Sequence, residues 1–190
     1  MSWTRACRVG LLSVLVLSGC VASPPAPEAA GKAEARTRLE ASFREAVKAM
    51  EAGNLAEARA RFRQLVNEHP DKAGPMVNLG IIAFRAGESD TASEWFRRAL
   101  TVNPKQVAAL NHLGVIARNA GELADAEQHY RAALASDPDY APALLNLAFL
   151  LDIYLGRPAE AVPLYERYQS VAREPDKRLE DWIFDAKNRR

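Results

Sequence analysis

Residues 107–138 read VAALNHLGVIARNAGELADAEQHYRAALASDP, and this stretch decides the fold because its pattern occurs twice more upstream. Four kinds of residue return in register every 34 positions: a glycine, an alanine, an aromatic residue and a proline. They are Gly53, Gly87 and Gly121; Ala58, Ala92 and Ala126; Phe62, Phe96 and Tyr130; and Pro70, Pro104 and Pro138. A fixed period of this length indicates an array of units that stack on their neighbours.

Further residues within the period identify the unit. Leu-Gly pairs at residues 79–80 and 113–114, Ala-Leu pairs at 99–100 and 133–134, and the closing proline resemble the tetratricopeptide repeat. The resemblance implies an all-α fold, a right-handed α-solenoid of about four helix pairs with a C-terminal capping helix. We place the array at residues 33–175, with repeats near 33–72, 73–106, 107–140 and 141–175, and the cap at 176–190.

The fourth copy, residues 141–175, departs from the register. Its glycine, alanine and aromatic residue each come one position late, at Gly156, Ala161 and Tyr165. We therefore predict a one-residue insertion near residues 154–155. Pro163 lies inside the second helix of this repeat, and we expect a bend there because proline removes a backbone hydrogen bond.

The N-terminal residues 1–19 have the layout of a secretory signal. Arg5 and Arg8 precede an apolar run, residues 9–17, which is too short to span a bilayer, since that takes about 20 apolar residues. The Leu-Ser-Gly-Cys sequence that ends at Cys20 resembles the bacterial lipoprotein box. The resemblance implies that Cys20 is lipidated and becomes the anchored N-terminus. The alternative is an ordinary signal peptide with an incidental cysteine.

The segment after Cys20 adds two expectations. In the lipoprotein family that the box resembles, an aspartate after the cysteine retains many Gram-negative members in the inner membrane. Val21 stands there, which favours the outer membrane with the domain on its periplasmic face. Residues 20–32 are rich in Pro and Ala after the cysteine, and we expect an extended tether between the lipid and the array.

Composition narrows the classes of function. The formal net charge is +1, and it is −1 without residues 1–19. The chain therefore lacks the excess of basic residues that is typical of nucleic-acid-binding proteins. Cys7 leaves with the signal and Cys20 takes the lipid, so we expect no disulfide, and three histidines offer little for a metal site. The sequence contains no phosphate-binding glycine loop, nucleophile elbow or zinc-protease motif. We expect no cofactor, no metal and no enzymatic activity.

The family resemblance also places a binding surface. In tetratricopeptide arrays the first helix of each repeat lines the inner, concave face, and the matching positions here form the candidate groove. They are Phe43, Val47 and Met50; Val77, Ile81, Phe84 and Arg85; Asn111, Val115, Arg118 and Asn119; and Leu145, Phe149, Asp152 and Ile153. An apolar floor with a few placed polar groups suits a peptide or helix of another protein.

The polar groove residues suggest how a partner is held. Arg85 and Arg118 are expected to hold a carboxylate, and the two asparagines to hydrogen-bond an extended backbone. The alternative is that the groove aromatics are additional core and the arginines are solvated surface. The lysine-and-asparagine clamp of some chaperone-binding members is not matched, because the groove positions include no lysine.

Together these features predict a lipid-anchored periplasmic scaffold that binds another envelope protein in its groove. Lipoproteins of similar layout include pilotins that escort secretins, adaptors for peptidoglycan hydrolases and proteins linked to TonB-type systems. The sequence does not choose among them. The alternative is a structural lipoprotein that self-associates through the apolar groove ends or the fourth repeat.

Overall fold

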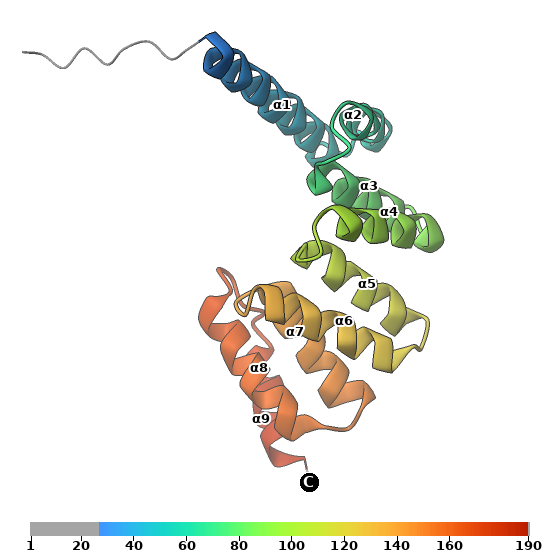
Figure 1. Ribbon diagram of the computed structural model, residues 1–190. Helices are drawn as coiled ribbons and strands as arrows, with labels where there is room; N and C mark the ends of the chain where they lie inside the picture. Colours follow the sequence, from blue (N-terminus) through green and yellow to red (C-terminus); the bar gives the residue numbers. More distant parts are fainter. Residues whose placement is uncertain (1–26, 190) are drawn as a thin grey trace, which may run out of the picture. The chain divides into compact units, whose positions relative to one another are not determined.

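The computed structural model describes residues 27–189, with side-chain surroundings from residue 31 onward. The predictions for the signal, for Cys20 and Val21, and for the first part of the tether lie outside the described residues. Residues 27–189 contain helices and connecting turns but no strand. In Figure 1 the elements follow one another as α1 (Pro27–Glu51), α2 (Leu55–Glu68), α3 (Ala73–Arg85), α4 (Ser89–Val102), α5 (Val107–Asn119), α6 (Leu123–Ser136), α7 (Ala141–Phe149), η1 (Leu150–Tyr154), α8 (Pro158–Val171) and α9 (Leu179–Asn188).

The chain divides into two compact units, residues 1–36 and 37–190. Of the first unit the structure describes the opening of α1, where residues 31–36 are exposed. This helix begins at Pro27, within the predicted tether, so residues 27–32 are helical and not extended. Proline is favourable at the first helical position, and the Glu-Ala-Ala that follows has high helix propensity.

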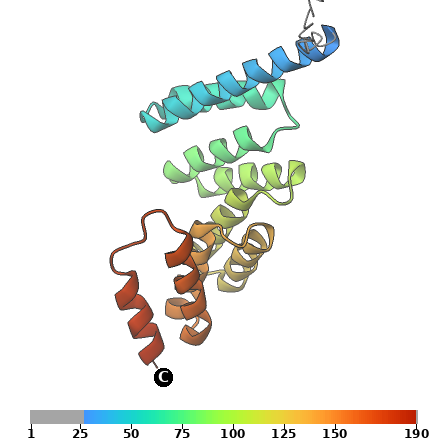
Figure 2. The same cartoon turned by 90° about the vertical axis from the view of Figure 1, so that its left-hand side faces the viewer.

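Within the second unit, helices pair in sequence order. Helix α3 packs on α4, α5 on α6 and α7 on α8, and each second helix also contacts the first helix of the next pair. The part of α1 from Thr37 onward packs on α2, where the ring centroids of Phe43 and Phe62 lie 5.6 Å apart. Helix α9 packs on α8 in the place of a further first helix, and Figure 2 shows it beside the end of the array. The stacked pairs confirm the all-α solenoid.

The periodic aromatic residues form the centre of each pair. Phe62, Phe96, Tyr130 and Tyr165 are completely buried. A glycine on the facing helix lets the ring approach, because a Cβ on Gly114 would lie only 2.5 Å from Tyr130, and one on Gly80 equally close to Phe96. The repeated small and aromatic residues are therefore the two halves of one contact.

The fourth repeat absorbs its extra residue in a π-helical turn. The Leu155 N–H donates to the Leu150 carbonyl oxygen at 3.0 Å, five residues back instead of the four of an α-helix. The predicted insertion is confirmed, and it begins at Leu150. Gly156 then makes the turn with φ +62°, a left-handed conformation that favours glycine. Helix α8 continues through the exposed Pro163 to Val171.

Two features of the described residues bear on function. No helix among them has both the length and the apolar composition required to cross a bilayer. No group of three or more His, Cys, Asp or Glu side chains within the same residues is arranged to hold a metal ion.

Candidate functional site

Three of the predicted groove residues are buried and are not available to a partner in this structure. Val77, Asn111 and Asp152 are only 5%, 4% and 3% exposed. Val77 belongs to the apolar core of the first repeats. Asn111 accepts a hydrogen bond of 2.9 Å from the side-chain amide of Asn146 on the next first helix. Neighbouring first helices lie side by side, so a residue on the flank of one is covered by the other.

Asp152 is held at the end of the array. Its Oδ2 accepts hydrogen bonds from the Tyr165 hydroxyl at 3.3 Å and from the Arg189 guanidinium at 3.1 Å. Burial beside this carboxylate raises the pKa of Tyr165, so the hydroxyl stays protonated and donates. The predicted role of Asp152 in a partner-binding groove is therefore replaced by an internal contact that joins η1, α8 and the C-terminal residues.

The predicted apolar groove residues are half-buried and contribute to the core. Phe149 lies edge-on between the rings of Tyr165 and Trp182, with centroids 5.9 and 4.7 Å away. The others pack against the two larger apolar clusters in the same way; they are Phe43, Val47, Met50, Ile81, Phe84, Val115 and Leu145. These contacts favour the alternative interpretation, in which the aromatic residues are additional core and not the floor of an open groove.

Of the remaining predicted residues, Ile153 is exposed in η1, and the other three form a polar surface on α3 and α5. Arg85 is the last residue of α3, and Arg118 and Asn119 end α5, a first helix that contacts α3. Arg85 and Asn119 are exposed and Arg118 is half-buried. Within residues 27–189 none of the three side chains makes a hydrogen bond or an ion pair. The structure thus brings these three groups to the same end of two adjacent first helices.

Arg118 and Tyr130 have polar atoms that are buried without a partner. The Arg118 Nε and the Tyr130 hydroxyl are both enclosed, and neither has a hydrogen bond within the described residues. The guanidinium carbon lies 6.0 Å from the centroid of the Tyr154 ring. Burial raises the pKa of Tyr130 to about 12, against the opposing effect of Arg118, so this hydroxyl is protonated at neutral pH.

His112 occupies the junction between the second and third repeats. Its ring stacks on Phe96 at 5.0 Å, nearly parallel, and lies 5.8 Å from Phe84. Burial, with Arg85 as a second cause, lowers the pKa of His112 below its usual value. The neutral imidazole is therefore a packing residue beside the polar surface.

An apolar hollow that the sequence did not predict lies at the opposite ends of these first helices. It has a volume of about 480 Å³. Its walls include Leu39, Phe43, Ala73, Pro75, Val102 and Gln106. Only Phe43 was among the predicted residues. The others come from α1, the start of α3 and the α4–α5 connection, so no single helical period marks them.

The stacked helix pairs define a helical-repeat protein. The chain belongs to the tetratricopeptide repeat family, because the family model matches residues 43–103 and 77–141, which together cover just over half of it. The fold is that of a protein-interaction scaffold, and members of this family are generally not enzymes. No curated protein sequence matches the chain.

Several solved structures share the fold. The structure of pilF from Pseudomonas aeruginosa is 19% identical, with a TM-score of 0.68 over 78% of this chain and 67% of that one. A MamA structure is 20% identical, with a TM-score of 0.62 over 78% and 80%. TTC0263, a thermophilic TPR protein of Thermus thermophilus, is 17% identical, with a TM-score of 0.63 over 78% and 80%. At these identities the likeness shows the fold alone.

Proposed function

We propose that this protein is a lipid-anchored scaffold on the periplasmic face of the bacterial outer membrane, and that it binds a segment of another envelope protein across its first helices. The observation that carries the proposal is the unpaired polar surface of Arg85, Arg118 and Asn119. Arg118 is half-buried while Arg85 and Asn119 are exposed, and side chains with unused hydrogen-bonding groups grouped in this way are suited to a polar partner.

The dimensions suit an extended peptide. The polar surface lies where α3 and α5 end, and the apolar hollow lies where they begin. Helix α3 has 13 residues, so its two ends are about 18 Å apart at 1.5 Å per residue. An extended segment of about six residues, at roughly 3.3 Å each, covers that distance. Such a segment would place an apolar side chain in the hollow and an acidic group near the arginines.

The anchor rests on the sequence. The lipoprotein box ending at Cys20 supports membrane attachment, and Val21 supports the outer membrane. A pilotin-like role, an adaptor role for peptidoglycan hydrolases and a role in a TonB-type system remain separate candidates for the partner system.

Site-specific photocrosslinking in intact cells tests this function. A benzophenone amino acid replaces Asn119 on the polar surface or, as the control, the exposed Glu94 on α4. We expect a discrete adduct with an envelope protein from position 119 and none of the same mass from position 94. Mass spectrometry of the adduct then names the partner. Equal adducts from both positions would move the binding site away from the first helices.

Self-association is the second candidate function. Three large apolar side chains are exposed within the described residues: Ile153 at 55%, Tyr154 at 53% and Phe184 at 67%. Burial of such side chains against another copy would remove apolar surface from water. Light scattering of the protein without residues 1–20 distinguishes the candidates, because a mass that stays monomeric over a hundredfold concentration range excludes the oligomer.

A further inference from the structure

We propose that a hollow on the outer side of the first two repeats binds a glutamate side chain of a second protein, through the guanidinium of Arg63. The site goes beyond the proposed function, because it is formed mainly by the second helices α2 and α4 and contains none of the groove residues. A scaffold with both sites would hold two proteins together.

The hollow is enclosed by residues of α2, α3 and α4 and of the turn before α4. Its volume is about 170 Å³, which is room for one side chain. The buried Leu79 and Ala83 form its floor, and the half-buried ring of Trp95 forms one wall. The remaining walls are polar or charged; they are Arg59, Arg63, Glu88 and Thr91.

The charges around the hollow are not balanced, because two arginines and one acid line it. Arg59 donates to both carboxylate oxygens of Glu88, at 3.1 and 3.3 Å. Arg63 lines the same hollow, and within the described residues its guanidinium makes no hydrogen bond or ion pair. One carboxylate from outside the chain would balance the charge and accept from these unused donors.

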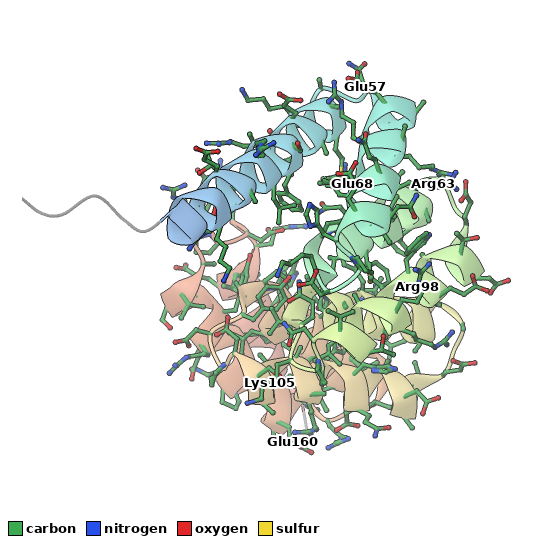
Figure 3. All side chains as sticks on the ribbon, turned by 45° about the horizontal axis from the view of Figure 1, so that its top comes forward. Glu57, Arg63, Glu68, Arg98, Lys105 and Glu160 are labelled. Atoms are coloured by element: carbon green, nitrogen blue, oxygen red, sulfur yellow. The ribbon has the colours of Figure 1, made fainter. Side chains whose placement is uncertain are left out.

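The last junction of the array contains the complete arrangement. Four residues there form four ion pairs, with N···O distances from 2.7 to 3.4 Å; they are Glu127, Arg131, Arg157 and Glu160. Because the fourth repeat runs one residue late, these positions are in register with Arg59, Arg63, Glu88 and Thr91, in that order. Arg131 thus corresponds to Arg63, and its partner Glu160 corresponds to Thr91 (Figure 3 labels Arg63 and Glu160). The first junction has the arginine without the acid.

The middle junction has an acid at the same position. Arg97 is in register with Arg63, and Asp125 is in register with Thr91. Among the three junctions of the array, the first alone combines the arginine with an uncharged residue, and the hollow lies beside that residue. A side chain from another protein would take the place that Glu160 occupies at the last junction.

The walls favour glutamate over a more highly charged anion. One carboxylate neutralises the single excess positive charge, whereas a phosphate dianion would reverse it. The methylene groups of glutamate can pack against Trp95, whose ring is already in contact with Arg98, with the guanidinium carbon 4.3 Å from the ring centroid. Glutamate is also the residue that completes the last junction.

Nuclear magnetic resonance of the full chain in detergent tests the site. The Trp95 indole N–H signal is assigned by its loss in Trp95→Phe. N-acetylglutamate α-amide is titrated at constant ionic strength, with the corresponding glutamine compound in parallel. We expect a saturable shift with the glutamate compound alone, and an affinity about fivefold weaker in Arg63→Gln, the upper effect of losing one exposed ion pair. Arg97→Gln removes the same charge from outside the hollow and should leave the affinity unchanged.

A second pair of variants tests whether the missing acid defines the site. Thr91→Glu supplies from within the chain the carboxylate that Glu160 supplies at the last junction, and Thr91→Gln fills the same space without charge. Thr91 is exposed, so both variants should keep the helicity of the wild type. We expect Thr91→Glu to abolish the shift and Thr91→Gln to weaken it less.

Each other outcome overturns the site. No saturable shift, or an equal shift with the glutamine compound, would exclude a carboxylate in the hollow. Full affinity in Arg63→Gln, or equal effects of the two Thr91 variants, would exclude the proposed pairing. The proposed function stands apart from these results, because the groove and its partner do not involve Arg63 and crosslinking from position 119 reports on the first helices.

Discussion

Replacing Gly114 with alanine tests whether close contact between α5 and Tyr130 sets the geometry of the third repeat. The added Cβ would lie 2.5 Å from Tyr130 Cε1, 2.7 Å from Cδ1 and 3.0 Å from Cζ. Because carbon atoms are in optimal contact at about 3.5–4.0 Å, the ring and the helix must separate by about 1 Å. Tyr130 has no exposed surface, so the displacement has to be taken up by the surrounding core.

The expected magnitude is a balance of two effects. Overpacking a well-packed core costs roughly 1–3 kcal/mol. Alanine gains about 1 kcal/mol over glycine inside a helix, which offsets part of that cost. The first and fourth repeats have Ala46 and Ala148 at this position, so the array can adjust to a methyl group. We therefore expect Gly114→Ala to lower the free energy of unfolding by about 1 kcal/mol.

Urea unfolding at 25 °C, followed by the helical circular dichroism signal, measures the change. Gly74→Ala is the matched control, because its Cβ would lie 3.4 Å from Phe43, an ordinary contact. The control should equal or exceed the wild type, whereas Gly114→Ala should fall below it. If the two variants are equally stable, the conclusion that position 114 needs glycine to make room for the Tyr130 ring is refuted.

Three further predictions concern the ends and the centre of the array. Cys20→Ser should move the protein from the membrane to the soluble envelope fraction, and a variant that stays with the membrane excludes anchoring through this cysteine. Arg189→Gln leaves the Asp152 carboxylate, which is 1% exposed, with Tyr165 as its one hydrogen-bond donor. Breaking a buried ion pair costs roughly 3–5 kcal/mol, but Arg189 is about half exposed, so we expect the free energy of unfolding in urea to fall by about 1–2 kcal/mol. An unchanged unfolding midpoint would contradict this. Folding raises the pKa of Tyr130 from 10.0 to about 12, so the protonated phenol stabilises the fold below pH 10 and this contribution is lost as the pH rises toward 12. In the Tyr130→Phe variant the free energy of unfolding should therefore fall less between pH 10 and pH 12 than in the wild type. An identical fall in both proteins would show that other groups cause it.

The fold could be predicted because its main contacts repeat. Each copy places a small residue opposite an aromatic one, as in Gly80 with Phe96, and the turn inside each helix pair has a glycine with positive φ, as at Gly53. The late arrival of Gly156 also revealed the insertion. Its form as a π-helical turn at residues 150–154 could not be predicted, because a loop of one more residue would give the same spacing.

The site could be predicted only in part. The family resemblance placed Asn111 and Asp152 on the inner face, but it does not show which contacts cover each residue. Asn111 is buried against Asn146 of the next repeat, and Asp152 against Tyr165 and Arg189. The apolar hollow was not predicted, because its walls come from α1, the start of α3 and the α4–α5 connection, which no single helical period joins.

The most direct test of whether the first helices bind the partner is to measure the affinity of charge-reversed variants for the protein that crosslinking identifies. One variant combines Arg85→Glu with Arg118→Glu; the control combines Arg63→Glu with Arg98→Glu, on α2 and α4, where Figure 3 labels both residues. Because a charge-assisted hydrogen bond contributes about 1.5–3 kcal/mol, the first variant should bind at least about tenfold more weakly, with unchanged helicity, while the control binds like the wild type. Equal binding by all three proteins would contradict recognition through the groove.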